Sequence, residues 1–166
     1  MSHQWQSEWT APVLLTAKKH LPELEKAKDL DRFFPGYAKK DADGRAEMWL
    51  CLVKALVLYE SNYNPKCYFK EPAPLNYESV GLLQLSYEDT AYKKLIVLNR
   101  DKKTLEDPIN NLCGGLRILA FLINRDGAIT TSKNKGGAAY WSTLREKRGL
   151  PKVLATLKKF LAEEKL

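Results

Sequence analysis

The stretch "LVLYESNYNPKCY", residues 56–68, places a glutamate at the end of an apolar segment. Upstream of it, large apolar residues recur at the spacing of one helix face, namely Trp49, Leu52, Val53 and Leu56. Each residue turns a helix by roughly 100°, so position 60 returns to the middle of that face. Glu60 is therefore predicted to lie on the core-facing side of a helix, at its C-terminal end.

Three effects on the Glu60 carboxyl act in one direction. Partial burial disfavours the carboxylate, the negative end of the helix dipole adds to this, and no adjacent basic residue offsets it. A carboxyl in that setting keeps its proton near neutral pH, as a general acid must. The alternative is that the helix frays before Glu60 and the side chain turns to solvent. Periodicity alone does not separate the two.

The length and net charge of the chain limit the classes of protein to which it can belong. The 166 residues suffice for one domain with a buried core, and no apolar run approaches the ~18 residues that span a bilayer. The net charge is +7, with basic residues concentrated in residues 144–160. Such a surface favours polyanions, among them nucleic acid, anionic lipid and an acidic cell-wall polymer, or is simply a solvated helical face. The start of the chain lacks the pattern of a signal peptide, so the protein is cytosolic or its leader is missing from this chain.

Cysteines and histidines do not form a metal site. Cys51, Cys67 and Cys113 include no pair with CxxC spacing, and both histidines, His3 and His20, lie near the N-terminus. Neither a metal nor a cofactor is expected.

The chain is predicted to be mainly α-helical, with a small β insertion, in an α+β fold. Asp43 or Asp41 is expected to cap the helix that leads to Glu60, and Asp107 to cap one that begins at Pro108. Prolines break the helical pattern over residues 64–78 and predict a loop with short strands. Helices are expected over residues 11–20, 21–34, 45–59, 87–98, 108–125, 135–147 and 152–161.

Two motifs carry a resemblance to a known family. "ESNYNP" is followed some twenty residues later by "SVGLLQLSYED". Together they resemble the lysozyme-like domain of soluble lytic transglycosylases, which is related to goose-type lysozymes. The first motif matches through Glu60, Ser61, Tyr63, Asn64 and Pro65, and the second through Ser79, Gly81, Leu82 and Gln84, with Leu83 in place of methionine.

Two further motifs follow in the family's order. "DPINNLCGGLRIL" is similar to the third family motif through Asp107, Pro108 and Asn111. "AAYWSTLR" is similar to the fourth only as far as Tyr140, because Trp141, Ser142 and Thr143 depart from it. The matched blocks extend from about residue 46 to residue 145, which leaves the first 40 residues unmatched.

The resemblance implies a lysozyme-like fold in which residues 41–166 form the catalytic domain and residues 1–40 a helical extension packed on it. It also implies cleavage of the β-1,4 bond between N-acetylmuramic acid and N-acetylglucosamine in peptidoglycan. Glu60 would protonate the glycosidic oxygen and then, as a carboxylate, take a proton from the muramic acid 6-hydroxyl, which closes a 1,6-anhydro ring. A hydrolytic lysozyme of the same fold would instead use water and a second carboxylate, at roughly 5–9.5 Å.

Several residues are expected to surround Glu60. Glu71 and Glu78 are the candidates for a second carboxylate or for substrate contacts. Tyr140 is expected to orient Glu60 through its hydroxyl, and Gln84 to offer its amide to a sugar. The remaining expected substrate-binding residues are Ser79, Gly81, Tyr87, Trp141 and Ser142, with aromatic side chains offering apolar faces to sugar rings.

A disulfide is expected between Cys67 and Cys113, where it would tie the β insertion to the helical body and leave Cys51 free in the core. The bridge presumes an oxidising compartment, and a periplasmic or secreted location is therefore expected, with a cytosolic or phage-encoded origin left open.

Two functions of other classes compete with the enzyme. A domain of this fold without activity would bind peptidoglycan glycan strands, although the retained Glu60 argues against this. The charge alone suggests nucleic-acid binding, but no recognition helix or aromatic–basic motif supports it. We expect a monomer that binds glycan strands and no nucleic acid.

Overall fold

Helix α4 (Ala42–Ser61) is the central element of the computed structural model, which describes residues 3–166. The Asp41 side chain caps it by accepting a 2.8 Å hydrogen bond from the Gly44 amide, so Asp41 is the cap of the two that the sequence offered. Its apolar face is fully covered, with Trp49 and Leu52 at 0 % exposed. The helix ends at Asn62, whose φ of 50° is left-handed.

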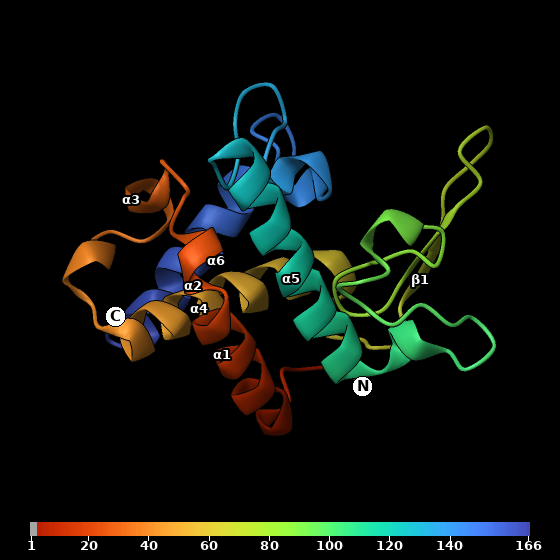
Figure 1. Cartoon of the computed structure of the whole chain (residues 1–166), viewed down its shortest axis with the longest axis horizontal. Coiled ribbons are helices and arrows are strands. Elements are labelled where there is room, and N and C mark those ends of the chain that lie inside the picture. The colour runs from red at the N-terminus through yellow and green to blue at the C-terminus, as the bar shows by residue number, and fades with distance from the viewer. Residues whose placement is uncertain (1–2) are drawn as a thin grey trace.

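The other helices surround α4. Helix α1 packs on both α4 and α5, α6 packs on α4, and α2 packs on α5 (Figure 1). No described helix is long and apolar enough to cross a membrane. The bounds are α1 Thr10–Lys19, α2 Leu21–Leu24, α3 Leu30–Phe33, α5 Pro108–Asp126 and α6 Leu150–Glu163.

A two-stranded sheet follows α4, as the prolines predicted. Strand β1 (Tyr68–Lys70) pairs antiparallel with β2 (Glu78–Val80), with Phe69 opposite Ser79. The hairpin and its connecting loop stand to one side of the helical body (Figure 1). The predicted α+β fold, mainly helical with a small sheet after the central helix, is confirmed.

The predicted single helix over residues 21–34 is wrong. The chain forms α2 and α3 instead and leaves the helical path between them, where tertiary bonds replace helical ones. The Lys28 amide donates to the Gly127 carbonyl at 2.9 Å, and the Asp29 carboxylate accepts from backbone amides beyond α5. A residue whose polar groups bond to another part of the chain no longer supplies those groups to its own helix.

The helices predicted over residues 87–98 and 135–147 are also wrong. Each region holds only short 3₁₀ turns, Thr90–Tyr92 in the first and Gly137–Ala139 and Ser142–Leu144 in the second. In the second region Gly136 has a φ of 67°, and a Cβ there would lie 2.0 Å from the Ala128 carbonyl oxygen. The chain therefore turns where the pattern predicted a continuous helix.

The predicted disulfide is absent, since Cys51, Cys67 and Cys113 are all free. Cys113 is 5 % exposed, on the core side of α5, whereas Cys67 lies half-buried in the loop before β1. The two cysteines thus belong to different surroundings, and Cys113 behaves as a small apolar residue of the core.

Candidate active site

A cleft of about 880 Å³ lies at the C-terminal end of α4. Its walls come from that helix end, the β hairpin, the turn after β2 and the segment 139–148. Segments far apart in the sequence thus meet around Glu60. The side chains that line the cleft and matter below are those of Glu60, Tyr68, Phe69, Glu71, Leu75, Tyr77, Ser79, Gln84, Asp89, Tyr140, Trp141, Ser142, Arg145 and Arg148.

Glu60 occupies the last turn of α4 and lines the cleft. Its Oε1 accepts a 2.7 Å hydrogen bond from the Thr143 hydroxyl. Burial raises the pKa of Glu60 to about 7, although the Thr143 bond acts in the opposite direction. A carboxyl with a pKa near neutral suits both proton donation and proton uptake.

The residue after Glu60 anchors the end of α4 to the turn that follows β2. The Ser61 hydroxyl donates to the Leu82 carbonyl at 2.8 Å, and Ser61 is only 6 % exposed. On the other side of this turn, the buried Asn111 side chain accepts from the Leu83 amide at 2.8 Å and donates to the Val80 carbonyl at 3.0 Å. The conformation of the turn is thus fixed by two side chains of family motifs, and with it the cleft wall next to Glu60.

Gly81 and Gln84, two predicted substrate contacts, act on this turn. Gly81 has a φ of 82°, and a Cβ would lie 2.3 Å from both the Asn111 Nδ2 and the Leu105 carbonyl oxygen, so it is required by the backbone and does not line the cleft. Gln84 does line the cleft, but its amide nitrogen donates to the carbonyls of Cys67 (3.1 Å) and Gly81 (2.9 Å). Only its amide oxygen remains for a ligand.

The hydroxyl of Tyr140 contacts a different carboxyl from the one expected. It donates to Asp89 Oδ2, and the hydroxyl that contacts Glu60 belongs to Thr143. Burial raises the pKa of Asp89 above its usual range, and the bond from Tyr140 opposes this. Burial and the nearby Asp89 charge also raise the pKa of Tyr140, which keeps it a hydrogen-bond donor.

Of the two predicted partner carboxylates, only Glu71 lines the cleft. Glu78 pairs with Arg100, and hydrogen bonds from Tyr68 and Arg100 lower its pKa. Tyr87 lies outside the cleft as well, because its hydroxyl accepts from the Leu105 amide at 3.1 Å and its ring lies under Arg100. The structure therefore places Glu78 and Tyr87 outside the cleft in which they were predicted to contact substrate.

The remaining predicted contacts all line the cleft but differ in exposure. Trp141 is 2 % exposed and its indole nitrogen donates to the Leu83 carbonyl at 2.9 Å, so it belongs to the core more than to a sugar site. Ser142 is exposed, and Ser79 is half-buried on β2. Both hydroxyls can therefore reach a ligand in the cleft.

Sequence reasoning missed the cleft residues Asp89, Arg145 and Arg148, and it missed Thr143, which contacts Glu60. The one signal for Thr143 was that residues 141–143 depart from the family's fourth motif. Asp89 lies in a segment read as helix, and the two arginines lie in a basic run that resembles an ordinary solvated surface. Nothing local distinguishes them.

The hairpin supplies an apolar wall. Tyr68, Phe69, Leu75 and Tyr77 line the cleft and are 55 %, 52 %, 60 % and 41 % exposed. Exposed aromatic rings of this kind can stack on the faces of sugar rings. Within residues 3–166, no group of three or more histidine, cysteine, aspartate or glutamate side chains could hold a metal ion.

The chain matches the family model described as "Transglycosylase SLT domain" over residues 38–153. Among solved structures it is similar to "Bd0314 DslA wild-type form 2", with 31 % identity, a TM-score of 0.76, and coverage of 92 % of this chain and 89 % of that one. Two variants of that protein, each with a different glutamate replaced by glutamine, match with 28 % and 29 % identity, TM-scores of 0.77 and the same coverage. No curated protein matches. The chain therefore belongs to the SLT transglycosylase family, whose members cleave glycosidic bonds in peptidoglycan.

Proposed function

We propose that this enzyme cleaves the β-1,4 bond between N-acetylmuramic acid and N-acetylglucosamine by lytic transglycosylation, with Glu60 as both general acid and general base. The observation that carries the proposal is the environment of Glu60. Its carboxyl lies in a cleft at the end of a buried helix, its pKa is about 7, and its one described polar partner is the neutral Thr143 hydroxyl. Such a carboxyl exchanges a proton in both directions near neutral pH.

The two carboxyl oxygens of Glu60 have different roles. Oε1 accepts from Thr143, which leaves Oε2 to carry the proton to the glycosidic oxygen. As the bond to the anomeric carbon breaks, the proton passes to the leaving N-acetylglucosamine oxygen and Glu60 becomes a carboxylate. The carboxylate then removes the proton of the muramic acid 6-hydroxyl, whose oxygen bonds to the anomeric carbon. The proton taken from the 6-hydroxyl restores protonated Glu60, so the cycle needs neither water nor a second protein carboxylate.

Hydrolysis by a second carboxylate is the competing chemistry, and two groups in the cleft support it. Glu71 lines the cleft, and so does Asp89. The glutamates replaced in the two DslA variants are eleven positions apart in that chain, the same separation as Glu60 and Glu71 here. We nevertheless favour transglycosylation, because Asp89 is bound by Tyr140 and Glu71 lies in the loop between the hairpin strands.

The walls of the cleft suit a glycan strand. Tyr68, Phe69 and Tyr77 offer apolar surfaces for the sugar faces, and the Ser79 and Ser142 hydroxyls offer hydrogen bonds to sugar substituents. An enzyme with this substrate works where peptidoglycan lies, in the periplasm or outside the cell, and we propose that location.

Mass spectrometry of the products tests the chemistry. Muropeptides released from purified sacculi are expected to end in 1,6-anhydro-muramic acid, which is one water lighter than a reducing end. Products with reducing ends only would identify a lysozyme, and Glu71→Gln and Asp89→Asn would then show which second carboxylate it needs.

A binding module without activity is the second candidate. Turbidity of a sacculus suspension separates it from an enzyme, because only an enzyme clears the suspension and only an enzyme loses this ability with Glu60→Gln. Sedimentation of both proteins with sacculi measures binding separately.

A further inference from the structure

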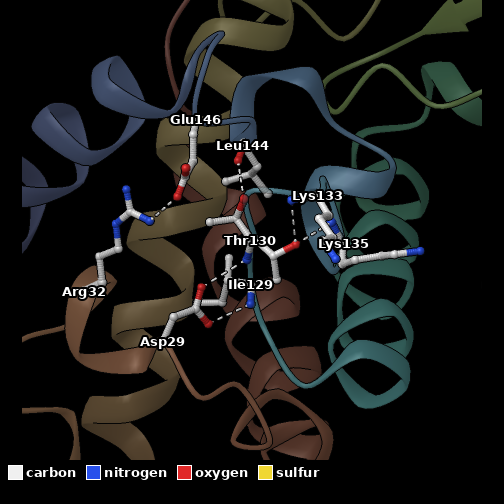
Figure 2. Close-up of polar contacts among 9 residues, drawn as sticks. Asp29, Arg32, Ile129, Thr130, Lys133, Lys135, Leu144 and Glu146 are labelled. Carbon is white, nitrogen blue, oxygen red and sulfur yellow. Dashed lines mark hydrogen bonds and ion pairs between the residues drawn. The ribbon is translucent and has the colours of Figure 1, made fainter.

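The segment 129–144 begins just after α5, and Tyr140, Trp141, Ser142 and Thr143 in it line the cleft or contact Glu60. Its start is held by a residue from outside the family-matched region 38–153. Asp29 Oδ1 accepts from the Ile129 amide at 2.8 Å and its Oδ2 accepts from the Thr130 amide at 3.1 Å (Figure 2). Two amide donors on one carboxylate make a strong and directional contact.

The contact continues from Thr130 to the far end of the segment. The Thr130 hydroxyl donates to the Leu144 carbonyl at 2.7 Å (Figure 2), and these two residues are 5 % and 0 % exposed. Leu144 follows Thr143 directly, and Thr143 donates to Glu60. Buried bonds of this kind are costly to break, because each broken bond leaves a polar group without a partner. The Asp29 carboxylate is therefore connected to Glu60 through three successive hydrogen bonds and one short backbone step, with the Ile129 bond as a parallel anchor.

A second contact from the same N-terminal region lies beside the first. Arg32, on α3, pairs with Glu146 at 2.9 Å, just beyond the segment (Figure 2). Both side chains are about half exposed, and exposed pairs contribute little by themselves. Asp29 is thus the stronger of the two contacts between the N-terminal region and the cleft segment.

We infer that Asp29 is a positioning residue of the active site, which fixes the base of segment 129–144 and thereby places the Thr143 hydroxyl against Glu60. The inference rests on the proposed role of Glu60. It gives the N-terminal region, which lies outside the family match, a part in the reaction.

The proton affinity of Glu60 reports directly on this connection. The Thr143 bond lowers the pKa of Glu60, so removal of that bond must raise it. An Asp29 that only supports the fold would leave this pKa unchanged in a protein that remains folded. The other charged or titratable cleft groups that could influence Glu60 are Cys67, Tyr68, Glu71, Tyr77, Asp89, Tyr92, Tyr140, Arg145 and Arg148.

The test is a double-mutant cycle read by NMR titration of glutamate carboxyls labelled with carbon-13, with Glu60→Gln identifying the signal. Thr143→Val and Asp29→Ala are each expected to raise the proton affinity of Glu60, by about two- to tenfold. The double variant is expected to show no further rise, because both changes remove the same bond. Asp29→Asn retains one acceptor oxygen and serves if Asp29→Ala does not fold.

Asp41→Ala is the matched control. It removes another carboxylate that accepts a backbone amide bond, at the opposite end of the helix that carries Glu60, and should leave the Glu60 titration unchanged. The inference is overturned if folded Asp29 variants titrate like the wild type, or if the Asp29 and Thr143 effects simply add. The titration does not depend on catalysis and so tests Asp29 alone. An active Glu60→Gln variant would overturn the proposed function and not this inference.

Discussion

The Thr143 hydroxyl donates a 2.7 Å hydrogen bond to Oε1 of Glu60, which precedes it by 83 residues. The bond stabilises the carboxylate, whereas burial stabilises the protonated form. Burial has the larger effect, since the pKa of Glu60 settles at about 7. The balance between these two effects leads to the first three predictions.

Glu60→Gln should reduce the clearance of sacculi by about 10²–10⁴-fold, because general acid–base catalysis contributes factors of that size. Glutamine has nearly the shape of glutamate and can still accept from Thr143, so folding and sacculus binding should persist. Turbidity measures the first and co-sedimentation the second. A variant with most of its activity would remove Glu60 from the mechanism.

The same substitution should stabilise the protein at alkaline pH. The folded state holds the Glu60 proton more tightly than the unfolded state, so the contribution of Glu60 to stability is fully present below pH 4.5 and is lost as the pH rises from 4.5 to about 7. Glu60→Gln lacks this loss and should be more stable at pH 8, by at most about 3 kcal/mol and by less because Glu60 is partly exposed. Urea unfolding of both proteins at pH 4 and pH 8 measures this gain. The same difference in unfolding free energy between variant and wild type at both pH values would contradict the assigned pKa.

The rate should depend on the protonation of Glu60. We expect kcat/KM to fall about tenfold per pH unit above pH 7, as the proton donor is lost. Soluble glycan fragments make the measurement possible without the charge effects of whole sacculi. A rate that stays level to pH 9 would show that protonated Glu60 is not required.

Tyr140→Phe should lower both stability and activity, because it removes the hydroxyl that donates to the half-buried Asp89 carboxyl. The expected cost is about 1–3 kcal/mol, with a smaller loss of activity than Glu60→Gln. Tyr92→Phe is the control, since the Tyr92 hydroxyl makes no hydrogen bond in the part of the chain that the structure describes. Equal unfolding free energies for the two variants would show that the Asp89 bond contributes nothing.

Gly81→Ala should destabilise the protein by about 2–5 kcal/mol, because the new Cβ meets Asn111 and a carbonyl oxygen in a left-handed backbone. Gly36 has nearly the same φ, 81°, but nothing within 4 Å of its Cβ position. Gly36→Ala should therefore cost only about 1–2 kcal/mol. Denaturant unfolding of the two variants measures both losses, and their difference gives the steric effect. Equal losses of unfolding free energy would mean that Asn111 and the turn move aside with little strain.

Local sequence predicted what local interactions decide. The periodicity before Glu60, the Asp41 cap and the start at Pro108 all concern residues within a few positions of one another, and all are found in the structure. The prolines after residue 64 likewise predicted a loop with short strands, because proline restricts the backbone whatever surrounds it.

Long-range contacts decided the rest. Asp29 leaves its predicted helix to accept from amides 100 and 101 residues away, and Thr143 meets Glu60 only when the chain closes on itself. The roles of Asp89 and Tyr140 depend on a bond across 51 residues. A single sequence holds no pattern for such pairs. The position of the cleft could therefore be predicted from Glu60, but the residues that contact Glu60 and Asp89 could not.

The covering of Trp49 has a practical consequence for fragments of this protein. Its indole packs on Phe34 at a centroid distance of 4.8 Å and donates to the Tyr37 hydroxyl at 2.9 Å. A fragment trimmed to the family-matched boundary at residue 38 would retain every cleft residue named above yet lay this fully buried ring open to solvent. The region that matches the family is therefore shorter than the unit that folds by itself. Expression of the shortened fragment would yield a protein prone to aggregate.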